Sequence, residues 1–327
     1  MIVALAPDGG RLVPVDAADP AALARAVWID VQNPTDDEKR AIERHTGLYV
    51  SSEEELKEIE SSSRMSMEEN VMYLSMPLAQ HIERRVIRSV PLGFALTRDR
   101  LLSVRYCDSR AFDLVRKRAE RFDSTHQTGA HVLVTLLETI VDRLADELER
   151  IRDDLDAISK RIFQDELGSN RAPRREDAAL RGILRAIGVS GDLVSRIRDS
   201  LLGVGRIVPF MQQMAKDFLA EDIKPRLDTL KDDVNSLSGY DGHLSEKVQF
   251  LLDATLGFIN IAQNNIMKAF TVFSVAGIPP VLVAGIYGMN FKFMPEYDWA
   301  WGYPYGLALI VVSFLVPLAA FKWRGWL

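Results

Sequence analysis

Hydrophobic residues are distributed unevenly along this chain of 327 residues, and its two longest uncharged segments lie near the C-terminus. Residues 269–291 and 299–321 contain no charged side chain, and each segment is 23 residues long. About 20 apolar residues suffice to cross a bilayer as a helix. The charged residues between the two segments are Lys292, Glu296 and Asp298. The pattern therefore predicts a tight transmembrane hairpin.

Amphipathic helices are predicted upstream of this hairpin. Between His131 and Phe163 apolar residues recur every three or four positions, and charged residues occupy the other faces, which is typical of a long amphipathic helix. A second helix is predicted from about Arg175 to Leu202. Because the break at 168–173 is short, we expect the two helices to be antiparallel.

The next region predicts one long helix that continues into the first uncharged segment. Residues 226–278 contain no proline, and their apolar positions are periodic. At 1.5 Å per residue such a helix is roughly 90 Å long. It cannot bury its apolar face alone, so we expect a bundle or an oligomer.

The first 125 residues alternate strand-like and helical segments, as in a mixed α/β domain. Thr35 is a predicted N-cap for a helix from Asp36 to His45, and Ser51-Ser52-Glu53-Glu54 predicts a second helix start. Arg98-Asp99-Arg100 is expected to be the turn of a hairpin. The strand-like runs span 26–31, 71–78, 90–97 and 101–106.

Composition argues against several classes of protein. Cys107 is the one cysteine, which excludes a disulfide framework, and the five histidines have no zinc-ligand spacing. A net charge of −6 argues against a nucleic-acid partner. The N-terminal region contains no phosphate-binding loop and no nucleophile elbow. We therefore expect neither an enzyme nor a resident cofactor.

The distribution of charge predicts the orientation of the hairpin. The chain starts without a basic region and long apolar core, so no cleaved signal peptide is expected. Lys322 and Arg324 directly follow the second segment, whereas the loop between the segments has a net charge of −1. Basic flanks stay in the cytoplasm. These features predict a multi-pass protein of the inner (plasma) membrane with both termini cytoplasmic.

Acidic residues are dense along the first amphipathic helix. They admit two interpretations: a solvated face with partners such as Arg150 and Arg152, or ligands for a regulatory divalent cation between subunits. The residues are Asp142, Asp146, Glu147, Glu149, Asp153, Asp154 and Asp156.

A polar stripe runs along the first predicted span at heptad spacing. Small and polar residues can simply let transmembrane helices approach closely. Alternatively, several copies surround a water-filled pore with an apolar gate at Ile278 and Val281. The Pro279-Pro280 pair favours the pore, because backbone groups freed in lipid need protein or water as partners. The stripe consists of Asn264, Met267, Thr271, Ser274, Ile278, Val281, Gly285 and Gly288.

The stripe ends in a short motif, Tyr287-Gly288-Met289-Asn290, where the chain leaves the predicted membrane. Gly288 exposes a backbone carbonyl and Asn290 supplies a neutral amide oxygen. A ring of such oxygens suits Mg²⁺, which dehydrates reluctantly and can be held through its own water. Carboxylates would hold the ion too tightly for release.

These residues give the sequence a specific resemblance. Tyr287 to Phe291, Phe293-Met294-Pro295-Glu296, Trp299 and Gly302-Tyr303-Pro304 resemble the CorA family of magnesium transporters. The basic end, Phe321 to Leu327, is similar to that family as well. Upstream, the resemblance includes Trp28-Ile29-Asp30 with Pro34, and Glu58 to Arg64.

The resemblance implies a funnel-shaped homopentamer in which the first transmembrane helix lines the pore. It implies that Tyr287, Gly288, Met289 and Asn290 form the outer selectivity filter, with Gly288 and Asn290 contacting the hydrated ion. The family's inner positions correspond to Asn264, Met267, Ile278, Val281 and Gly285. Ile278 and Val281 stand where Met and Thr occur in some members. Glu296 would concentrate cations at the outer mouth, partly opposed by Lys292.

The predicted function is passive influx of hydrated Mg²⁺, driven by the membrane potential and closed by cytoplasmic Mg²⁺; the closure is implied by the resemblance alone. The expected partners are the lipid bilayer and divalent cations, with Co²⁺ and Ni²⁺ as further candidates. A zinc or cobalt/nickel transporter of the same superfamily is the nearest alternative. A membrane-anchored cytoplasmic binding or scaffold protein is the alternative from another class.

The predicted fold is an α/β cytoplasmic domain plus a long helical stalk that continues into a two-helix transmembrane hairpin. The predicted divisions are the α/β domain at 1–127, antiparallel cytoplasmic helices at 128–222, the stalk at 223–265, the pore-lining span at 266–290, the extracytoplasmic loop at 291–301, the second span at 302–322 and the basic tail at 323–327.

Overall fold

The computed structural model describes residues 1–58, 60, 64–82, 86–121, 128–165, 173–215, 219–289, 292 and 294–326. The chain forms two compact units. The first comprises Met1–Ala172 and Arg181–Leu252, and the second comprises Pro173–Leu180 and Asp253–Leu327.

A mixed β-sheet forms the centre of the first unit. Among the described residues it has seven strands in the order β2-β1-β3-β7-β6-β5-β4. The strands β3 and β7 are parallel, and the remaining neighbours are antiparallel. The strands are β1 (Ile2–Asp8), β2 (Arg11–Val15), β3 (Trp28–Gln32), β4 (Met65–Glu68), β5 (Val71–Ile82), β6 (Val86–Leu96) and β7 (Leu101–Arg105).

The predicted hairpin between the last two strands is confirmed. Leu96 of β6 pairs with Leu101 of β7 in an antiparallel register. The Thr97 hydroxyl accepts hydrogen bonds from the backbone N–H groups of Asp99 (3.4 Å) and Arg100 (3.1 Å). Both β5 and β6 are longer than their sequence patterns predict, because the two strands pair with each other along their whole length.

Short helices flank the sheet, and the predicted N-cap at Thr35 and the predicted helix start at 51–54 are confirmed. Thr35 and Ser52 each form a capping box with the glutamate three residues later. Gly47 ends the first of these capped helices in the left-handed conformation, φ 70°. The helices are α1 (Pro20–Arg25), α2 (Asp36–Thr46), α3 (Glu53–Leu56) and α5 (Arg110–Arg121).

Strand β3 is buried on both faces. Ile29 and Val31 pack into a hydrophobic core with Leu23 of α1, Ile42 of α2 and Leu56 of α3. On the opposite face, the Trp28 ring lies 6.3 Å from the ring of Phe112 in α5. Alternate residues of a strand point to opposite faces, so the apolar residues of β3 hold helical layers against both faces of the sheet.

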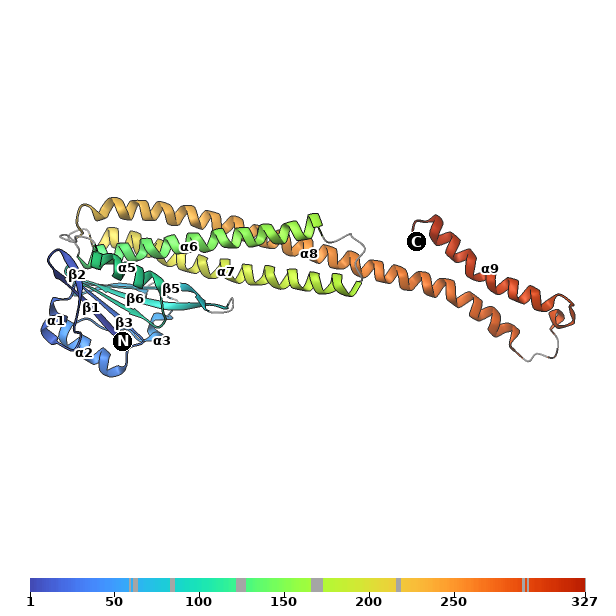
Figure 1. Ribbon diagram of the computed structural model, residues 1–327, viewed down its shortest axis with the longest axis horizontal. Helices are drawn as coiled ribbons and strands as arrows, with labels where there is room; N and C mark the ends of the chain where they lie inside the picture. The colour runs from blue at the N-terminus through green and yellow to red at the C-terminus, as the bar shows by residue number, and fades with distance from the viewer. Residues whose placement is uncertain are drawn as a thin grey trace. The chain divides into compact units, whose positions relative to one another are not determined.

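Three long helices complete the first unit, and they lie side by side there (Figure 1). Glu138 of α6 pairs with Arg226 of α8 at 2.6 Å, and Asp156 pairs with Lys247 at 2.6 Å, so α6 and α8 are parallel. Arg198 of α7 pairs with Asp241 of α8 at 2.7 Å. The helices are α6 (Gly129–Lys160), α7 (Pro173–Met214) and α8 (Ile223–Tyr287), and a π-helical segment (Arg161–Asp165) follows α6.

The second helix of this group is longer than predicted. It continues to Met214 instead of ending near Leu202. A Cβ atom on Gly203 would lie 2.7 Å from Cβ of Met76 in β5, and one on Gly205 would lie 3.3 Å from a methyl group of Val234 in α8. These glycines therefore serve close packing of α7 and do not end it.

A buried ion pair links the parallel strands at the centre of the sheet. Asp30 of β3 accepts hydrogen bonds from Nη2 of Arg105 (2.9 Å) and from the hydroxyl of Ser103 (2.9 Å), both in β7. The indole of Trp28 donates to the same hydroxyl at 3.0 Å. The guanidinium group also lies 5.0 Å from the ring centre of Phe112. The side chains of Asp30 and Arg105 are only 4% and 3% exposed, so each charge depends on the other for compensation.

We predict that Asp30→Asn destabilises the first unit strongly, because it leaves the Arg105 charge buried without a counter-charge. Loss of one partner of a buried pair costs about 3–5 kcal/mol, which lowers the unfolding midpoint on the order of 10 °C. Circular dichroism of the detergent-solubilised protein measures this midpoint. The matched control is Arg40→Gln, which breaks the exposed pair between Asp37 and Arg40 and should change it little. Equal midpoints for the two variants would contradict the prediction.

Candidate functional site

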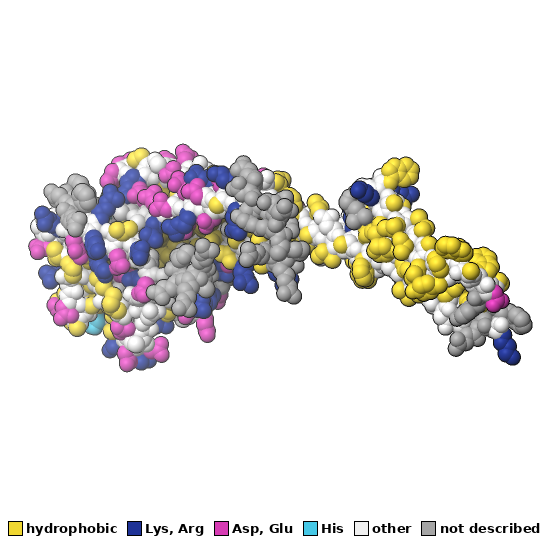
Figure 2. Space-filling model, turned by 45° about the vertical axis from the view of Figure 1, so that its right-hand side comes forward, with side chains coloured by type: hydrophobic (Ala, Val, Ile, Leu, Met, Phe, Trp, Pro, Cys, Tyr) yellow, Lys and Arg dark blue, Asp and Glu magenta, His cyan; other side chains and the backbone are white. Residues whose placement is uncertain are grey.

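The second unit contains two apolar helices that are joined as a hairpin. The distal part of α8 leads through a 3₁₀ turn, η2 (Pro295–Asp298), into α9 (Gly302–Trp323). Both α8 and α9 are long and apolar enough to cross a membrane. Figure 2 shows hydrophobic side chains gathered over this part of the chain. The apolar surface is unusually exposed for a protein in water, which fits a lipid environment.

The hairpin partner α9 covers one face of α8 and leaves the predicted polar stripe uncovered. Val272 and Ala276 are buried, with 8% and 2% of their surfaces exposed. Ile278 is 57% exposed and Val281 is 71% exposed. With 3.6 residues per turn, Ala276 and Ile278 point about 200° apart around the helix axis. At the depth of Ile278 and Val281 the stripe therefore faces away from α9 and is available to another surface.

One polar side chain of the stripe already has a defined hydrogen bond. The hydroxyl of Thr271 donates to the backbone carbonyl of Met267 at 2.7 Å. Its proton is thereby used within the helix, and its oxygen keeps a lone pair as an acceptor. The water molecules of a hydrated cation are hydrogen-bond donors, so this orientation suits such an ion.

Two prolines lie at the middle of the same span and leave backbone acceptors without intrahelical donors. Pro279 and Pro280 are within α8, so the carbonyls of Val275 and Ala276 lack the usual i+4 N–H partner. Inside a membrane such groups need protein or water as partners. This depth of α8 therefore favours contact with a polar environment over full exposure to lipid.

The C-terminal end of α8 is formed without a left-handed cap. Gly288 N–H donates to the carbonyl of Ala284 at 2.9 Å, and Met289 N–H donates to that of Ile286 at 3.2 Å. A Cβ atom on Gly288 would lie 3.1 Å from the Ala284 oxygen. Glycine is therefore favoured at this position because a side chain would crowd the Ala284 oxygen, and not because the backbone needs a positive φ. Asn290, the last residue of the predicted filter, lies outside the described residues.

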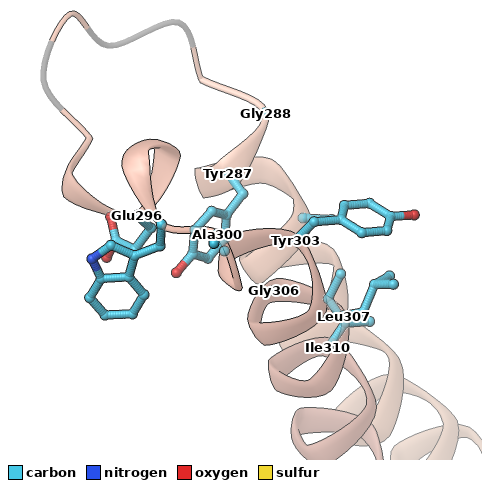
Figure 3. Close-up of a pocket in the computed structure, with 11 residues that line it drawn as sticks. Tyr287, Gly288, Glu296, Ala300, Tyr303, Gly306, Leu307 and Ile310 are labelled. Atoms are coloured by element: carbon cyan, nitrogen blue, oxygen red, sulfur yellow. The ribbon is translucent and has the colours of Figure 1, made fainter.

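A cavity of about 560 Å³ brings three of the predicted site residues together (Figure 3). Tyr287 and Gly288 of α8 and Glu296 of η2 line it, together with residues at the start of α9. The first turn of α9 lies close to η2, because a Cβ atom on Gly302 would lie 2.3 Å from the Glu296 carbonyl oxygen. No site role was predicted for the other lining residues, which are Ala284, Trp299, Ala300, Gly302, Tyr303, Gly306, Leu307 and Ile310.

Those lining residues had a detectable sequence signal. Trp299 and Tyr303 are aromatic residues beside an apolar span, and such residues concentrate where a helix meets the membrane surface. Trp299 also packs edge to face on Tyr305, with ring centres 5.9 Å apart. The aromatic contact and the close approach at Gly302 hold Glu296 beside the end of α8.

The acidic residues of α6 divide into paired and crowded groups. Glu147 pairs with Arg150 at 3.0 Å, and Asp153 pairs with Arg152 at 2.9 Å. Burial raises the pKa of Asp142, and repulsion from Glu138, Asp146 and Asp233 adds to this effect. Within the described part of one chain, no group of three or more His, Cys, Asp or Glu residues could hold a metal ion. A cation site between subunits stays a prediction.

Comparisons with known proteins bear on the whole chain. A family model described as the CorA-like Mg²⁺ transporter protein matches residues 24–323. The magnesium transport protein CorA of Haemophilus ducreyi is 33% identical over 327 residues, covering 100% of both chains. The protein of the same name from Escherichia coli K12 is 32% identical over 328 residues, again covering 100% of both.

A solved structure extends the likeness to the fold. The CorA magnesium transporter of Methanocaldococcus jannaschii matches with a TM-score of 0.76, covering 100% of this chain and 99% of that one. Its sequence identity of 18% limits this comparison to the fold. The family model and the two relatives show the likeness in sequence. The resemblance predicted from the sequence motifs is confirmed: this chain belongs to the family of CorA-like Mg²⁺ transporter proteins.

Proposed function

We propose that the protein conducts hydrated Mg²⁺ passively into the cytoplasm as a homopentamer, with the α8 stripe of each subunit facing a common axis. The observation that carries this proposal is the polar stripe on the side of α8 opposite α9. Each Mg²⁺ carries two charges, and the membrane potential supplies about 2.3 kcal/mol per charge per 100 mV. The driving force is therefore about 4.6 kcal/mol per 100 mV, which is enough for inward flux without coupling to a second ion.

The selectivity filter follows from the chemistry of the motif at the outer end. Five copies of the Gly288 carbonyl and the Asn290 amide would present neutral oxygens to the waters around the ion. Mg²⁺ keeps its water because dehydration is costly, so contact through water lets the ion bind and leave. Glu296 would raise the local concentration of cations at this mouth, with Lys292 partly opposing it.

A gate is proposed at the apolar part of the stripe. Ile278 and Val281 are one helical turn apart, and both side chains are exposed. Five copies at this depth would form two apolar rings, from which water withdraws when the rings are narrow. The carbonyls of Val275 and Ala276, which lack intrahelical donors, lie close by along the chain. The helix is therefore less tightly bonded at this depth, so a modest change in helix packing could alter the width of the two apolar rings.

Closure by cytoplasmic Mg²⁺ is proposed to act through acidic residues between subunits. Burial raises the pKa of Asp142, and repulsion from the neighbouring carboxylates Glu138, Asp146 and Asp233 adds to it. A divalent cation would relieve such repulsion and draw the subunits together, whereas its loss would loosen them. Mutagenesis of the α6 acidic residues would identify the ligands of that ion.

Donor chemistry favours Mg²⁺ over the alternatives of the same superfamily. Neither the stripe nor Tyr287 to Asn290 contains a cysteine or histidine, and soft or borderline metals prefer thiolate and imidazole ligands. A simple membrane anchor would not need an exposed stripe with Asn264, Thr271 and Ser274. The geometry therefore supports ion conduction better than a scaffold role.

We predict that Asn290→Ala reduces Mg²⁺ uptake by about 100-fold or more, because a ring of acceptors is lost and each hydrogen bond contributes about 1 kcal/mol. Uptake in cells that depend on the transporter measures the effect. Asn265→Ala is the matched control, since this residue lies on the α9 side of the helix. Assembly of both variants should be unchanged. Normal flux in Asn290→Ala would refute the filter assignment.

We predict that replacing both Ile278 and Val281 with Ser makes a leakier pore, because polar rings hold water where apolar rings exclude it. Resting conductance in planar bilayers at high Mg²⁺ on the cytoplasmic side is the measurement. Val283→Ser is the control, because Val283 points about 160° away from Val281 around the helix. Equal resting conductance in the double variant and the wild type would argue against a gate at this depth.

We predict Mg²⁺ flux into proteoliposomes that depends on an inside-negative potential and is blocked by hexammine cobalt(III), which resembles the hydrated ion and cannot lose its ligands readily. The same vesicles compare Mg²⁺ with Zn²⁺, Co²⁺ and Ni²⁺, each with and without a proton gradient. Spermidine, another trivalent cation, controls for simple charge screening.

Insensitivity to the complex would indicate that the ion passes without its water. Equal block by spermidine would show that the block reflects the trivalent charge alone and not likeness to the hydrated ion. Flux that requires the proton gradient would overturn the passive mechanism. Preference for Zn²⁺ would move the protein to the nearest alternative class.

A further inference from the structure

The C-terminal end of α9 folds back on the helix through a specific hydrogen-bond pattern. Trp326 N–H donates to the carbonyl of Phe321 at 3.0 Å, and Gly325 N–H donates to that of Lys322 at 3.2 Å. Gly325 has a φ of 71°, so the three features form a Schellman motif. The rings of Trp326 and Phe321 stack with centres 5.4 Å apart. The indole is therefore held beside the helix by the backbone.

This indole lines a second cavity in the hairpin, which has a volume of about 510 Å³. Apolar residues of α8 and α9 line most of it, and Lys268 and Asn265 are the polar side chains of its lining. The apolar lining residues are Ala269, Val272, Phe273, Ala276, Gly277, Phe314, Leu318 and Trp326. The cavity thus combines a long apolar wall with one cation and one amide.

No acidic side chain compensates the cation at this end of the hairpin. Residues 254–295 contain no Asp or Glu, and neither do residues 299–327. Within the described part of the chain, Lys268 has no ion-pair partner. Lys322 and Arg324 add two exposed cations next to the cavity in sequence. In Figure 2 the acidic side chains of the hairpin lie at its opposite end.

The position of Lys268 along α8 matches the edge of a membrane. Nineteen residues separate it from Tyr287, which corresponds to about 28 Å of helix, and the hydrocarbon core is about 30 Å thick. If Tyr287 is at the outer surface, Lys268 is at the cytoplasmic surface. Anionic lipids concentrate in that leaflet and attract basic side chains, and tryptophan favours the same interface.

We propose that this cavity is a binding site for an anionic phospholipid of the cytoplasmic leaflet. Lys268 and Asn265 contact the phosphate, Lys322 and Arg324 provide the surrounding positive potential, and an acyl chain lies along Val272 and Leu318. The orientation of the site rests on the proposed membrane topology, but the lipid contact does not depend on ion transport.

A second copy of the chain fits this cavity less well than a lipid does. The spans of a neighbouring subunit carry no carboxylate near this depth, because the closest acidic residue before Lys268 is Asp253, about 22 Å away along the helix. A neighbour would therefore leave Lys268 without a counter-charge in an apolar setting, which is costly. A phosphate diester supplies the missing negative charge, and its chains fill the apolar part.

Native mass spectrometry of the full-length, delipidated assembly tests the proposal. Phosphatidylglycerol and phosphatidylcholine with identical acyl chains are added at equal concentration, and the bound lipids are counted. The wild type should retain about fivefold more phosphatidylglycerol, as expected for about 1 kcal/mol from one interfacial cation. Lys268→Gln should abolish this preference, and Lys268→Arg should keep it. The matched control, Lys292→Gln, removes a lysine from the loop at the other end of the hairpin and should leave the lipid preference unchanged.

Three results would overturn the lipid site. One is an unchanged preference in Lys268→Gln. A second is complete displacement of the lipid by glycerol phosphate, which would show that a free phosphate suffices. The third is a change of subunit number in Lys268→Gln without a change in lipid retention, which would assign the cavity to a neighbouring subunit. Trp326→Ala offers an independent check, because loss of this lining ring should lower retention of both lipids. Mg²⁺ flux measured on the same samples separates failure of the lipid site from failure of the transport proposal.

Discussion

A helix that passes from water into lipid must form all of its backbone hydrogen bonds internally in the lipid part, while its side chains meet two different solvents. Helix α8 does this over 65 residues. In the first unit its polar side chains pair with α6 and α7, as Arg226 does with Glu138. Beyond Asp253 the rest of α8 contains no acidic residue, so it cannot form such ion pairs within itself. In lipid, the main structural requirement is that the helix hydrogen-bonds its own backbone. The prolines at 279 and 280 are the exception, and they coincide with the proposed gate.

Local patterns in the sequence were sufficient for the elements that depend on one helix alone. The capping boxes at Thr35 and Ser52, the two apolar spans and the stripe on α8 each follow from residues a few positions apart. Such features are set by backbone hydrogen bonding and helical periodicity. Ile278 and Val281 are exposed on the side of α8 opposite the α9 contact, and their pore-lining role stays a prediction.

Features that depend on distant segments could not be predicted in this way. The parallel pairing of β3 with β7, the buried Asp30–Arg105 pair and the extension of α7 past Gly203 all depend on neighbours far along the chain. The glycines of α7 look like helix breakers in isolation, but Gly203 permits contact with Met76. The cavity that holds Glu296 is another case, because it needs the close approach at Gly302. The role of Asn290 still rests on sequence alone.

The distribution of fixed charge around α8 separates the proposed ion path from the proposed lipid site. A lysine facing a narrow cation pathway would oppose conduction, since a unit charge a few ångströms away costs several kcal/mol in a partly dry environment. Lys268 follows Met267 directly, yet it lines the cavity shared with α9, whereas Met267 lies on the exposed stripe. One residue of offset rotates the side chain by about 100°. The helix can therefore present neutral oxygens and apolar rings to an ion, and at the same depth present a cation to a lipid phosphate.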